Sequence, residues 1–248
     1  MKILVCISSV PDTTSKINFT ADKSEFDKNG IQWVINPLDE FALTKAVKLQ
    51  QSQGAKVTVV TVGDAATEAV IRKALAIGAD EAIRVNAEPK DSFSVAKEIA
   101  NVAQNGGYDL VLCGKESIDY NGGAVPGMVA QLLDKSFVNA CVGLEVNDGK
   151  VQAAREIDGG KETVEVALPA VVAGQKGMVD EKELIIPNMR GIMSARTKPL
   201  NVQEPVATEV KVEAVSFDSV PPRAAVKLFS PDDLDGLVKA LHEEAKVI

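Results

Sequence analysis

Short apolar runs alternate with helical patterns from Lys2 to about Asp134, and this alternation is the strongest constraint on the fold. Strands are expected at residues 3–7, 57–62, 81–85 and 110–113, with helices at 38–53, 65–77, 92–103 and 123–133. Strands that are apolar at successive positions are typically buried on both faces. Strands separated by helices pair in parallel through right-handed crossovers. The pattern therefore predicts an α/β protein with a doubly wound, mostly parallel sheet.

After Asp134 the pattern changes to strand-like segments joined by tight turns. Residues 138–146, 150–157 and 163–168 are strand-like, and turn sequences at 147–149 and 158–160 connect them. Both turns contain glycine, which tolerates the positive φ that hairpins require. With a further strand at 169–173, we expect an antiparallel extension of the sheet rather than a separate domain.

Regular periodicity fades between Val179 and about Arg223, where prolines at 187, 199, 205, 221 and 222 disfavour long helices and central strands. A terminal helix is expected with Ser230 as its N-cap and Pro231 at its first position. Its apolar stripe consists of Leu234, Leu237, Val238 and Leu241. A long arm of this kind often needs a partner to complete it. We expect one α/β domain over residues 1–225 and a C-terminal arm with its helix over residues 226–248.

The charge and cysteine content narrow the classes of function. The formal net charge is −8 and no cluster of Lys and Arg is present, which argues against nucleic-acid binding. No segment approaches 18 consecutive apolar residues, and residues 1–10 have no signal-peptide cleavage site. Three cysteines (Cys6, Cys113 and Cys141) lie far apart in apolar runs, as free thiols in a reducing compartment do. A cytoplasmic protein that does not insert into membranes is expected.

Residues for catalysis are not indicated by any pattern in the sequence. The one histidine is His242, in a charged stretch near the C-terminus. None of the common nucleophile, metal-ligand or P-loop motifs is present, and no metal site is expected. We therefore expect a protein that is not itself an enzyme.

A glycine-rich segment follows the strand at 110–113 and runs from Gly114 to Gly127. Ligands of open α/β sheets bind beyond the carboxyl ends of the strands. Glycines let backbone N–H groups approach a ligand, and the next helix offers the positive end of its dipole. The segment suits a nucleotide phosphate, although a merely flexible connection fits its spacing equally well.

The segment from Ala153 to Val164, followed by residues 169–173, resembles the signature of electron-transfer flavoprotein beta subunits. Further similar segments occur in the family's order: residues 3–7, 10–12, 35–37, 74–80, 114–119 and 192–196, and the final helix. The resemblance spans nearly the whole chain. It implies an adenine-nucleotide-binding type of fold and a heterodimer with an alpha subunit. An FAD is then held mainly by alpha, over a shallow bowl formed by beta.

The resemblance also implies a structural AMP in this chain, with segments around Thr13 and Leu38 near the flavin edge. The implied cofactor-binding residues are Cys6, Asn36, Pro37, Leu38, Asp39, Val62, Gly114, Lys115, Glu116, Ser117, Ile118, Asp119, Tyr120, Asn121, Gly122, Gly123, Ala124 and Val125. Family members with a second FAD carry hydroxyl and amide side chains in a Gly-Asp-Thr-Ala-Gln-Val type of loop. Residues 120–125 depart from that loop, so AMP is favoured over a second, bifurcating FAD. They depart from the AMP-binding form as well.

The resemblance places partner contacts at Glu156 and in a recognition loop at about 179–198. Alignment on Ile192-Met193 puts Met189 at the docking position, whereas alignment on Pro187-Asn188 puts Ile186 there. We prefer Met189, because an unbranched thioether adapts to several pockets. The expected partners are dehydrogenases such as acyl-CoA dehydrogenase and an acceptor such as a quinone oxidoreductase. A pair between Asp119 and Arg155 is a further hypothesis.

Two other classes of function remain open on the residues alone. One is a nucleotide-binding stress or signalling protein of similar architecture, and the other is a nucleotide-dependent ligase or hydrolase. Residues 179–248 favour the electron carrier, because a docking loop and an arm add nothing to a compact nucleotide sensor.

Overall fold

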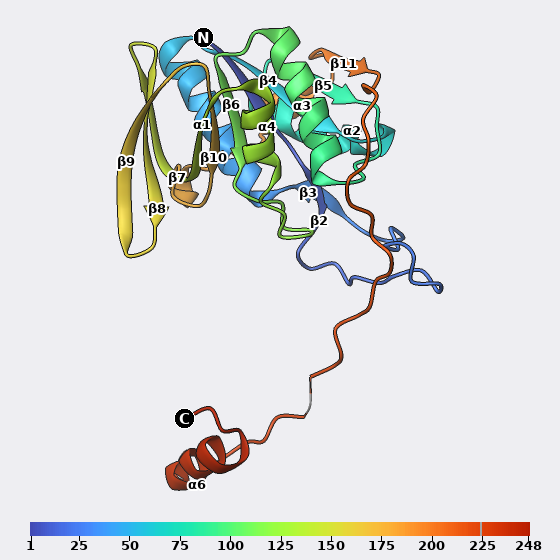
Figure 1. Ribbon diagram of the computed structural model, residues 1–248, viewed down its shortest axis with the longest axis vertical. Helices are drawn as coiled ribbons and strands as arrows, with labels where there is room; N and C mark the ends of the chain where they lie inside the picture. The colour runs from blue at the N-terminus through green and yellow to red at the C-terminus, as the bar shows by residue number, and fades with distance from the viewer. Residues whose placement is uncertain (224) are drawn as a thin grey trace. The chain divides into compact units, whose positions relative to one another are not determined.

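The structure is a computed structural model that describes residues 1–223 and 225–248 (Figure 1). Its contacts divide the chain into two units. The larger unit comprises Met1–Lys16 and Lys28–Val215, and the smaller one comprises Ile17–Asp27 and Ser216–Ile248. All candidate nucleotide-site residues lie in the larger unit.

A nine-stranded sheet forms the centre of the larger unit, in the order β11-β5-β4-β1-β6-β10-β7-β8-β9. The strands are β1 (Lys2–Cys6), β4 (Lys56–Val62), β5 (Glu81–Val85), β6 (Leu110–Gly114), β7 (Ser136–Asn147), β8 (Lys150–Ile157), β9 (Gly160–Ala167), β10 (Ala170–Gly174) and β11 (Leu200–Gln203). Neighbours from β11 to β7 pair in parallel, and β7-β8-β9 pair antiparallel. The predicted fold class is confirmed.

Helices cover both faces of the sheet (Figure 1). They are α1 (Pro37–Gln53), α2 (Glu68–Ile77), α3 (Ser92–Gly106), α4 (Val125–Leu133) and α5 (Met189–Ala195). Side chains of α1, α2 and α5 join one buried cluster with Ile3 and Val5 of β1. Side chains of α3 and α4 join the other cluster with Leu4 and Cys6. Successive β1 residues thus face opposite layers, which is why the strand is apolar from Ile3 onward.

The region after Asp134 differs from expectation in one respect. Strand β10 is not part of the antiparallel extension, because it lies between β6 and β7 and pairs in parallel with both. The extension itself is confirmed as the meander β7-β8-β9. Its turns contain Gly149 at φ +74° and Gly159 at φ +86°, the backbone form that glycine favours.

Between Val179 and Arg223, a stretch that the structure describes throughout, there is no long helix or central strand, as the prolines predict, but two short elements are present that the periodicity does not indicate. Helix α5 begins after Asn188, whose Oδ1 accepts a hydrogen bond from Gly191 N at 2.8 Å. Strand β11 lies between Pro199 and Pro205 and pairs only with β5. It is an edge strand, where flanking prolines remove no hydrogen bond from the sheet's interior. A 3₁₀ turn, η2 (Glu181–Glu183), precedes α5.

Helices α2 and α5 are joined through each other's C-terminal ends. Arg72 of α2 donates through Nη1 to the carbonyls of Ala195 and Lys198, both at 2.9 Å. Lys198 Nζ in turn donates to Leu75 O at 2.9 Å and Ala79 O at 2.6 Å, at the end of α2. Leu75 and Ala195 lie in the last turns of α2 and α5, where carbonyls have no partner within the helix, so the two cations satisfy them. A Cβ on Gly191 would lie 2.5 Å from Ala76 O, so the helices approach closely there.

Three helices begin later than predicted, among them α4, which starts at Val125 and not at residue 123. The segment from Ala65 opens with a 3₁₀ turn, η1 (Ala65–Thr67), before α2. The terminal helix α6 (Leu234–Lys239) is capped by Asp233, whose Oδ1 accepts from Gly236 N at 3.0 Å, and not by Ser230. Ser230 instead accepts a turn hydrogen bond from Asp233 N at 3.0 Å.

The smaller unit also joins segments that are far apart in sequence. The Phe19 and Phe217 rings stack with centroids 5.2 Å apart, and Phe217 N donates to Lys23 O at 2.9 Å. Helix α6 continues as a π-helical turn, η3 (Ala240–Glu244). Leu234 and Val238 on its predicted stripe are exposed, whereas Leu237 and Leu241 are half-buried.

Replacing Lys198 by Met should lower the free energy of unfolding by about 1–3 kcal/mol, because the carbonyls of Leu75 and Ala79 lose a charged donor. The matched control is Arg190→Met, on the exposed side of the same segment. This variant should change the free energy of unfolding by less than about 0.5 kcal/mol. Urea unfolding measures both variants. Equal losses in the free energy of unfolding of both variants would show that the hydrogen bonds of Lys198 to the end of α2 make no specific contribution to stability.

Candidate functional site

The order of the parallel strands places a topological switch point between β1 and β6, and the region beyond the carboxyl ends of these two strands is called the crevice. From β1 the chain proceeds outward to β4 and β5 on one side, and later to β6 and β10 on the other. The connections on the two sides therefore diverge at the carboxyl ends of β1 and β6. Open α/β sheets bind ligands at such a switch point. Cys6 ends β1 and Gly114 ends β6, so two predicted segments meet here.

Asp39 ties the two strand ends together. Its Oδ2 accepts a hydrogen bond from Ser8 N at 2.7 Å, and its Oδ1 accepts one from Gly114 N at 2.8 Å. Asp39 lies in the first turn of α1, where Pro37 starts the helix without needing an N–H partner. A Cβ on Gly114 would lie 2.9 Å from Leu38 Cβ and 3.0 Å from Asp39 N, so only glycine fits this approach.

The electrostatics of Asp39 follow from its enclosure. The side chain is 3% exposed. Burial raises the pKa of this carboxyl from 3.8 to about 7, although hydrogen bonds from Ser8, Gly114 and Asn36 act in the opposite direction. The carboxyl thus changes charge near neutral pH, at the junction of the two strands.

Asn36 fixes the start of the glycine-rich segment. Its Nδ2 donates to Glu116 O at 2.9 Å, and its Oδ1 accepts from Ile118 N at 3.3 Å. Its backbone N–H donates to Ser8 O at 3.0 Å. Asn36 is 1% exposed, so these polar atoms bond within the protein. Asn36 and Asp39, both predicted as cofactor contacts, therefore hold the backbone that surrounds the crevice.

The glycine-rich segment forms a closed turn. Ser117 and Gly122 exchange two backbone hydrogen bonds of 3.1 Å, and Lys115 N donates to Gly174 O at 2.7 Å. Asp119 accepts hydrogen bonds from Ser117 Oγ and, at 2.9 Å, from Tyr120 N. The segment is thus an ordered loop. Its sequence alone did not distinguish such a loop from a flexible connection.

The end of this loop leaves space beside the backbone. A Cβ on Gly122 would meet nothing within 4 Å, and one on Gly123 would come no closer than 3.4 Å, to Lys115 O. Helix α4 follows with Ala124 at its N-cap and no side-chain cap. Backbone N–H groups in the first turn of a helix have no acceptor within the helix. The loop therefore presents open space next to uncapped donors, an arrangement suited to an anion.

The remaining predicted cofactor residues surround this region. Val62 ends β4 next to β1 and is half-buried. Asn121 has φ +50°, and Tyr120 is 73% exposed. Val125 is the first residue of α4 and is half-buried. Thr13 is exposed, beyond the two-stranded sheet of β2 (Ser9–Pro11) and β3 (Trp33–Ile35).

The predicted partner residues belong to other elements. Glu156 is exposed on β8 and accepts a hydrogen bond from Gln175 Nε2. Arg155 forms an ion pair with Glu162 on β9 at 3.3 Å and not with Asp119, because the β8–β9 register places these two residues opposite each other.

Four apolar side chains are exposed in and next to α5. The exposed fractions are 83% for Ile186, 75% for Met189, 41% for Ile192 and 57% for Met193. Ile185, in contrast, packs against the core. A groove of about 590 Å³ lies along the contact between α2 and α5, and Ile192 and Arg196 are among its lining residues.

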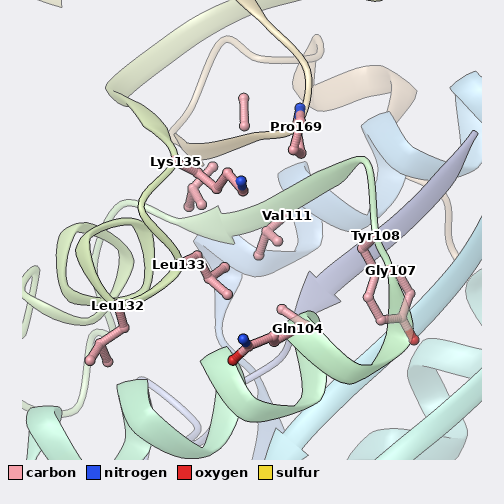
Figure 2. Close-up of a pocket in the computed structure, with 11 residues that line it drawn as sticks. Gln104, Gly107, Tyr108, Val111, Leu132, Leu133, Lys135 and Pro169 are labelled. Carbon is pink, nitrogen blue, oxygen red and sulfur yellow. The ribbon is translucent and has the colours of Figure 1, made fainter.

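A second cavity, of about 320 Å³, lies at the opposite end of the sheet from the crevice (Figure 2). Leu133 from the end of α4, Gln104 from α3 and Tyr108 ahead of β6 line it. None of the predicted cofactor residues belongs to its lining. Within the described residues, no His, Cys, Asp and Glu side chains gather in a group of three that could hold a metal ion. No helix in the described part of the chain is long and apolar enough to cross a membrane.

Two contributors to this region were not predicted as site residues. Gly174, at the end of β10, accepts the hydrogen bond from Lys115 N, which depends on β10 lying next to β6. Cys113 lies on β6 directly before Gly114. The apolar run at 110–113 is the only sequence signal for its position.

The free energy of unfolding should depend on pH through Asp39. Between about pH 4 and 7 the unfolded chain releases this proton and the folded chain retains it, so stability should fall as pH rises. The contribution is on the order of 4 kcal/mol across the range. Asp39→Asn should remove this slope, and Asp64→Asn, which changes an exposed carboxylate, should retain it. Urea unfolding at several pH values measures the difference, and equal slopes in both variants would contradict the assignment.

Comparison with known proteins agrees with this architecture. Residues 24–208 match the family model described as the electron transfer flavoprotein domain. The chain is 36% identical to the electron transfer flavoprotein subunit beta of Syntrophomonas wolfei, over 99% of this chain and 96% of that protein. It is 32% identical to the subunit beta of Bacillus subtilis, over 100% of both chains, and 32% identical to that of Homo sapiens, over 97% and 98%. The chain belongs to the electron transfer flavoprotein family.

Proposed function

We propose that this chain is the beta subunit of a heterodimeric electron-transfer flavoprotein and binds a structural AMP at the β1–β6 crevice. The observation that carries the proposal is the loop at residues 114–124. Asn36 and Asp39 fix its backbone by hydrogen bonds, and it ends at the uncapped start of α4. The similarity to beta subunits over nearly the full chain supports the heterodimer.

The residues present suit a nucleotide monophosphate. The phosphate would lie beside Gly122 and Gly123, where no side chain fills the space. It would accept hydrogen bonds from backbone N–H groups of the loop and of the first turn of α4. Cys6, Val62 and Leu38 would line the nucleotide's apolar side. Asn36 and Asp39 act as positioning residues, because their polar atoms already bond the backbone.

The FAD of the heterodimer, held mainly by the alpha subunit, accepts and donates the electrons when bound. The part of this chain is to form the surface on which the flavin rests, near Thr13 and Leu38. The second candidate is a bifurcating type with another FAD in place of AMP. The bare backbone at Gly122 and Gly123 favours AMP, because a second flavin nucleotide would call on side-chain donors in this loop.

The exposed apolar side chains of α5 support a docking role. Dehydrogenases such as acyl-CoA dehydrogenase would bind at Met189 or Ile186, and a quinone oxidoreductase or another acceptor would receive the electrons. The anchoring of α5 on α2 presents these side chains from a fixed platform. Glu156 and the arm at 226–248 would contact the alpha subunit. Three free cysteines fit a cytoplasmic setting.

Acid extraction of the purified heterodimer should release AMP and about one FAD. Gly122→Val should lower the recovered AMP at least tenfold, because its side chain enters the space assigned to the phosphate. Gly160→Val is the matched control, since it adds the same side chain where a Cβ meets nothing within 4 Å, but on a distant hairpin. Chromatography of the extract measures both nucleotides. Two FAD and no AMP would support the bifurcating alternative instead.

Met189→Ala should slow reduction of the heterodimer's flavin by an acyl-CoA dehydrogenase about tenfold in kcat/KM, the loss of roughly 1.4 kcal/mol of contact. Thermal unfolding and flavin content should stay unchanged, because Met189 is 75% exposed. Ile186→Ala tests the alternative docking residue, and Val215→Ala, at an exposed position outside α5, is the control. Unchanged rates in the Met189 and Ile186 variants would remove α5 from the docking surface.

A further inference from the structure

Cys6 and Cys113 lie side by side at the ends of neighbouring strands. Strands β1 and β6 pair in parallel, with Val5 opposite Leu112, so the next step in register puts Cys6 opposite Cys113. Both side chains point to the same layer, because both belong to the buried cluster beneath α3 and α4. They are 7% and 3% exposed.

The two thiols are neighbours within this cluster. The adjacent Cys113 thiol, followed by burial, raises the pKa of the Cys6 thiol well above its usual value, which slows the reaction of Cys6 as long as it stays enclosed. Neighbouring strands are about 4.8 Å apart. That spacing is within the roughly 4.4–6.8 Å between Cα atoms that a disulfide requires. The spacing of the strands is therefore compatible with a disulfide between the two positions.

The third cysteine provides an internal comparison. Cys141 lies on β7, in the buried cluster on the opposite side of the sheet, and its thiol donates to Gly143 O at 3.1 Å. It is as buried as the other two and has no thiol neighbour. A reaction that needs two adjacent sulfur atoms will therefore spare Cys141.

The cysteine pair is next to the groups that form the crevice. Cys113 directly precedes Gly114, and Cys6 is two residues before Ser8. Asp39 binds the backbone N–H groups of both Ser8 and Gly114. A covalent bond between the cysteines would act on the same two strand ends that Asp39 joins. A change in their spacing would reach the glycine-rich loop, which begins at Gly114.

We propose that Cys6 and Cys113 form a redox-active dithiol whose disulfide form is coupled to the occupancy of the nucleotide crevice. The oxidant is a low-molecular-weight disulfide, R–S–S–R. One cysteine thiolate attacks it and releases one R–SH, and the second cysteine then displaces the other R–S group as R–SH. The two protein sulfurs are oxidised to one S–S bond, the small disulfide is reduced, and both thiol protons end on the released R–SH molecules.

Disulfide formation should be coupled to nucleotide binding, because the nucleotide would limit the access of an oxidant to the two thiols. This part of the inference rests on the proposed AMP site. Buried thiols react slowly, so oxidation needs an opening of the strand ends. A nucleotide seated over Cys6 and the loop after Gly114 stabilises the closed arrangement. Nucleotide binding should therefore protect the dithiol, and by linkage the disulfide should weaken nucleotide binding by the same factor.

The test uses the purified heterodimer, stripped of nucleotide or reloaded with AMP, and oxidised glutathione as the disulfide. Peptide mapping by mass spectrometry should find a Cys6–Cys113 disulfide in the stripped protein, with Cys141 still free. Cys6→Ser and Cys113→Ser should each abolish it, and Cys141→Ser should leave it unchanged. Phenylarsine oxide, which bridges adjacent thiols, should bind the reduced protein once and protect it from oxidation.

Three free thiols, or only single glutathione adducts, in the stripped protein would overturn the dithiol. Loading with AMP should slow disulfide formation at least tenfold, and equal rates with and without bound AMP would overturn the coupling. A heterodimer that takes up no AMP would contradict the proposed nucleotide site. The disulfide measurement in the same sample remains decisive for the cysteine pair, so the two failures are distinguishable.

Discussion

The buried carboxyl of Asp39, which accepts hydrogen bonds from the ends of both β1 and β6, is the interaction on which the crevice depends. The connections that leave the two strands diverge at this switch point, although the strands themselves pair as far as Val5 and Leu112. Asp39 links the two strand ends from the first turn of α1, and Asn36 extends this link to the loop after β6. The start of one helix thus fixes the backbone that follows both strands.

The crevice combines a fixed frame with an incomplete surface. Its polar side chains are satisfied internally, whereas its open positions are backbone at Gly122 and Gly123 and the start of α4. Such a surface binds through shape and peptide dipoles rather than through side-chain charge. This division suits a nucleotide that stays bound as part of the structure.

Much of the fold could be predicted because local hydrophobic periodicity determines it. The strands at 3–7 and 81–85 and the helix at 38–53 agree with β1, β5 and α1 to within one or two residues. The place of β10 depends on long-range pairing of Val171 with Val111 and Phe137, which no local pattern encodes. Helix α5 has only seven residues and depends on α2 for its stability, so its own sequence predicts it weakly.

The candidate site likewise has features that local sequence predicts and features that depend on long-range contacts. Its place was predictable, because strand-end loops bind ligands in this class of sheet. The orientation of Asn36 was not, since it bonds Glu116, 80 residues away.

The reciprocal caps between α2 and α5 make the attachment of α5 independent of its exposed side chains. Arg72 and Lys198 bond only main-chain carbonyls across these helices, so the outward residues of α5 are free to vary without disturbing that attachment. Under the docking role proposed for α5, a lineage could exchange partners by surface substitutions alone, without altering the hydrogen bonds that hold the helix on α2.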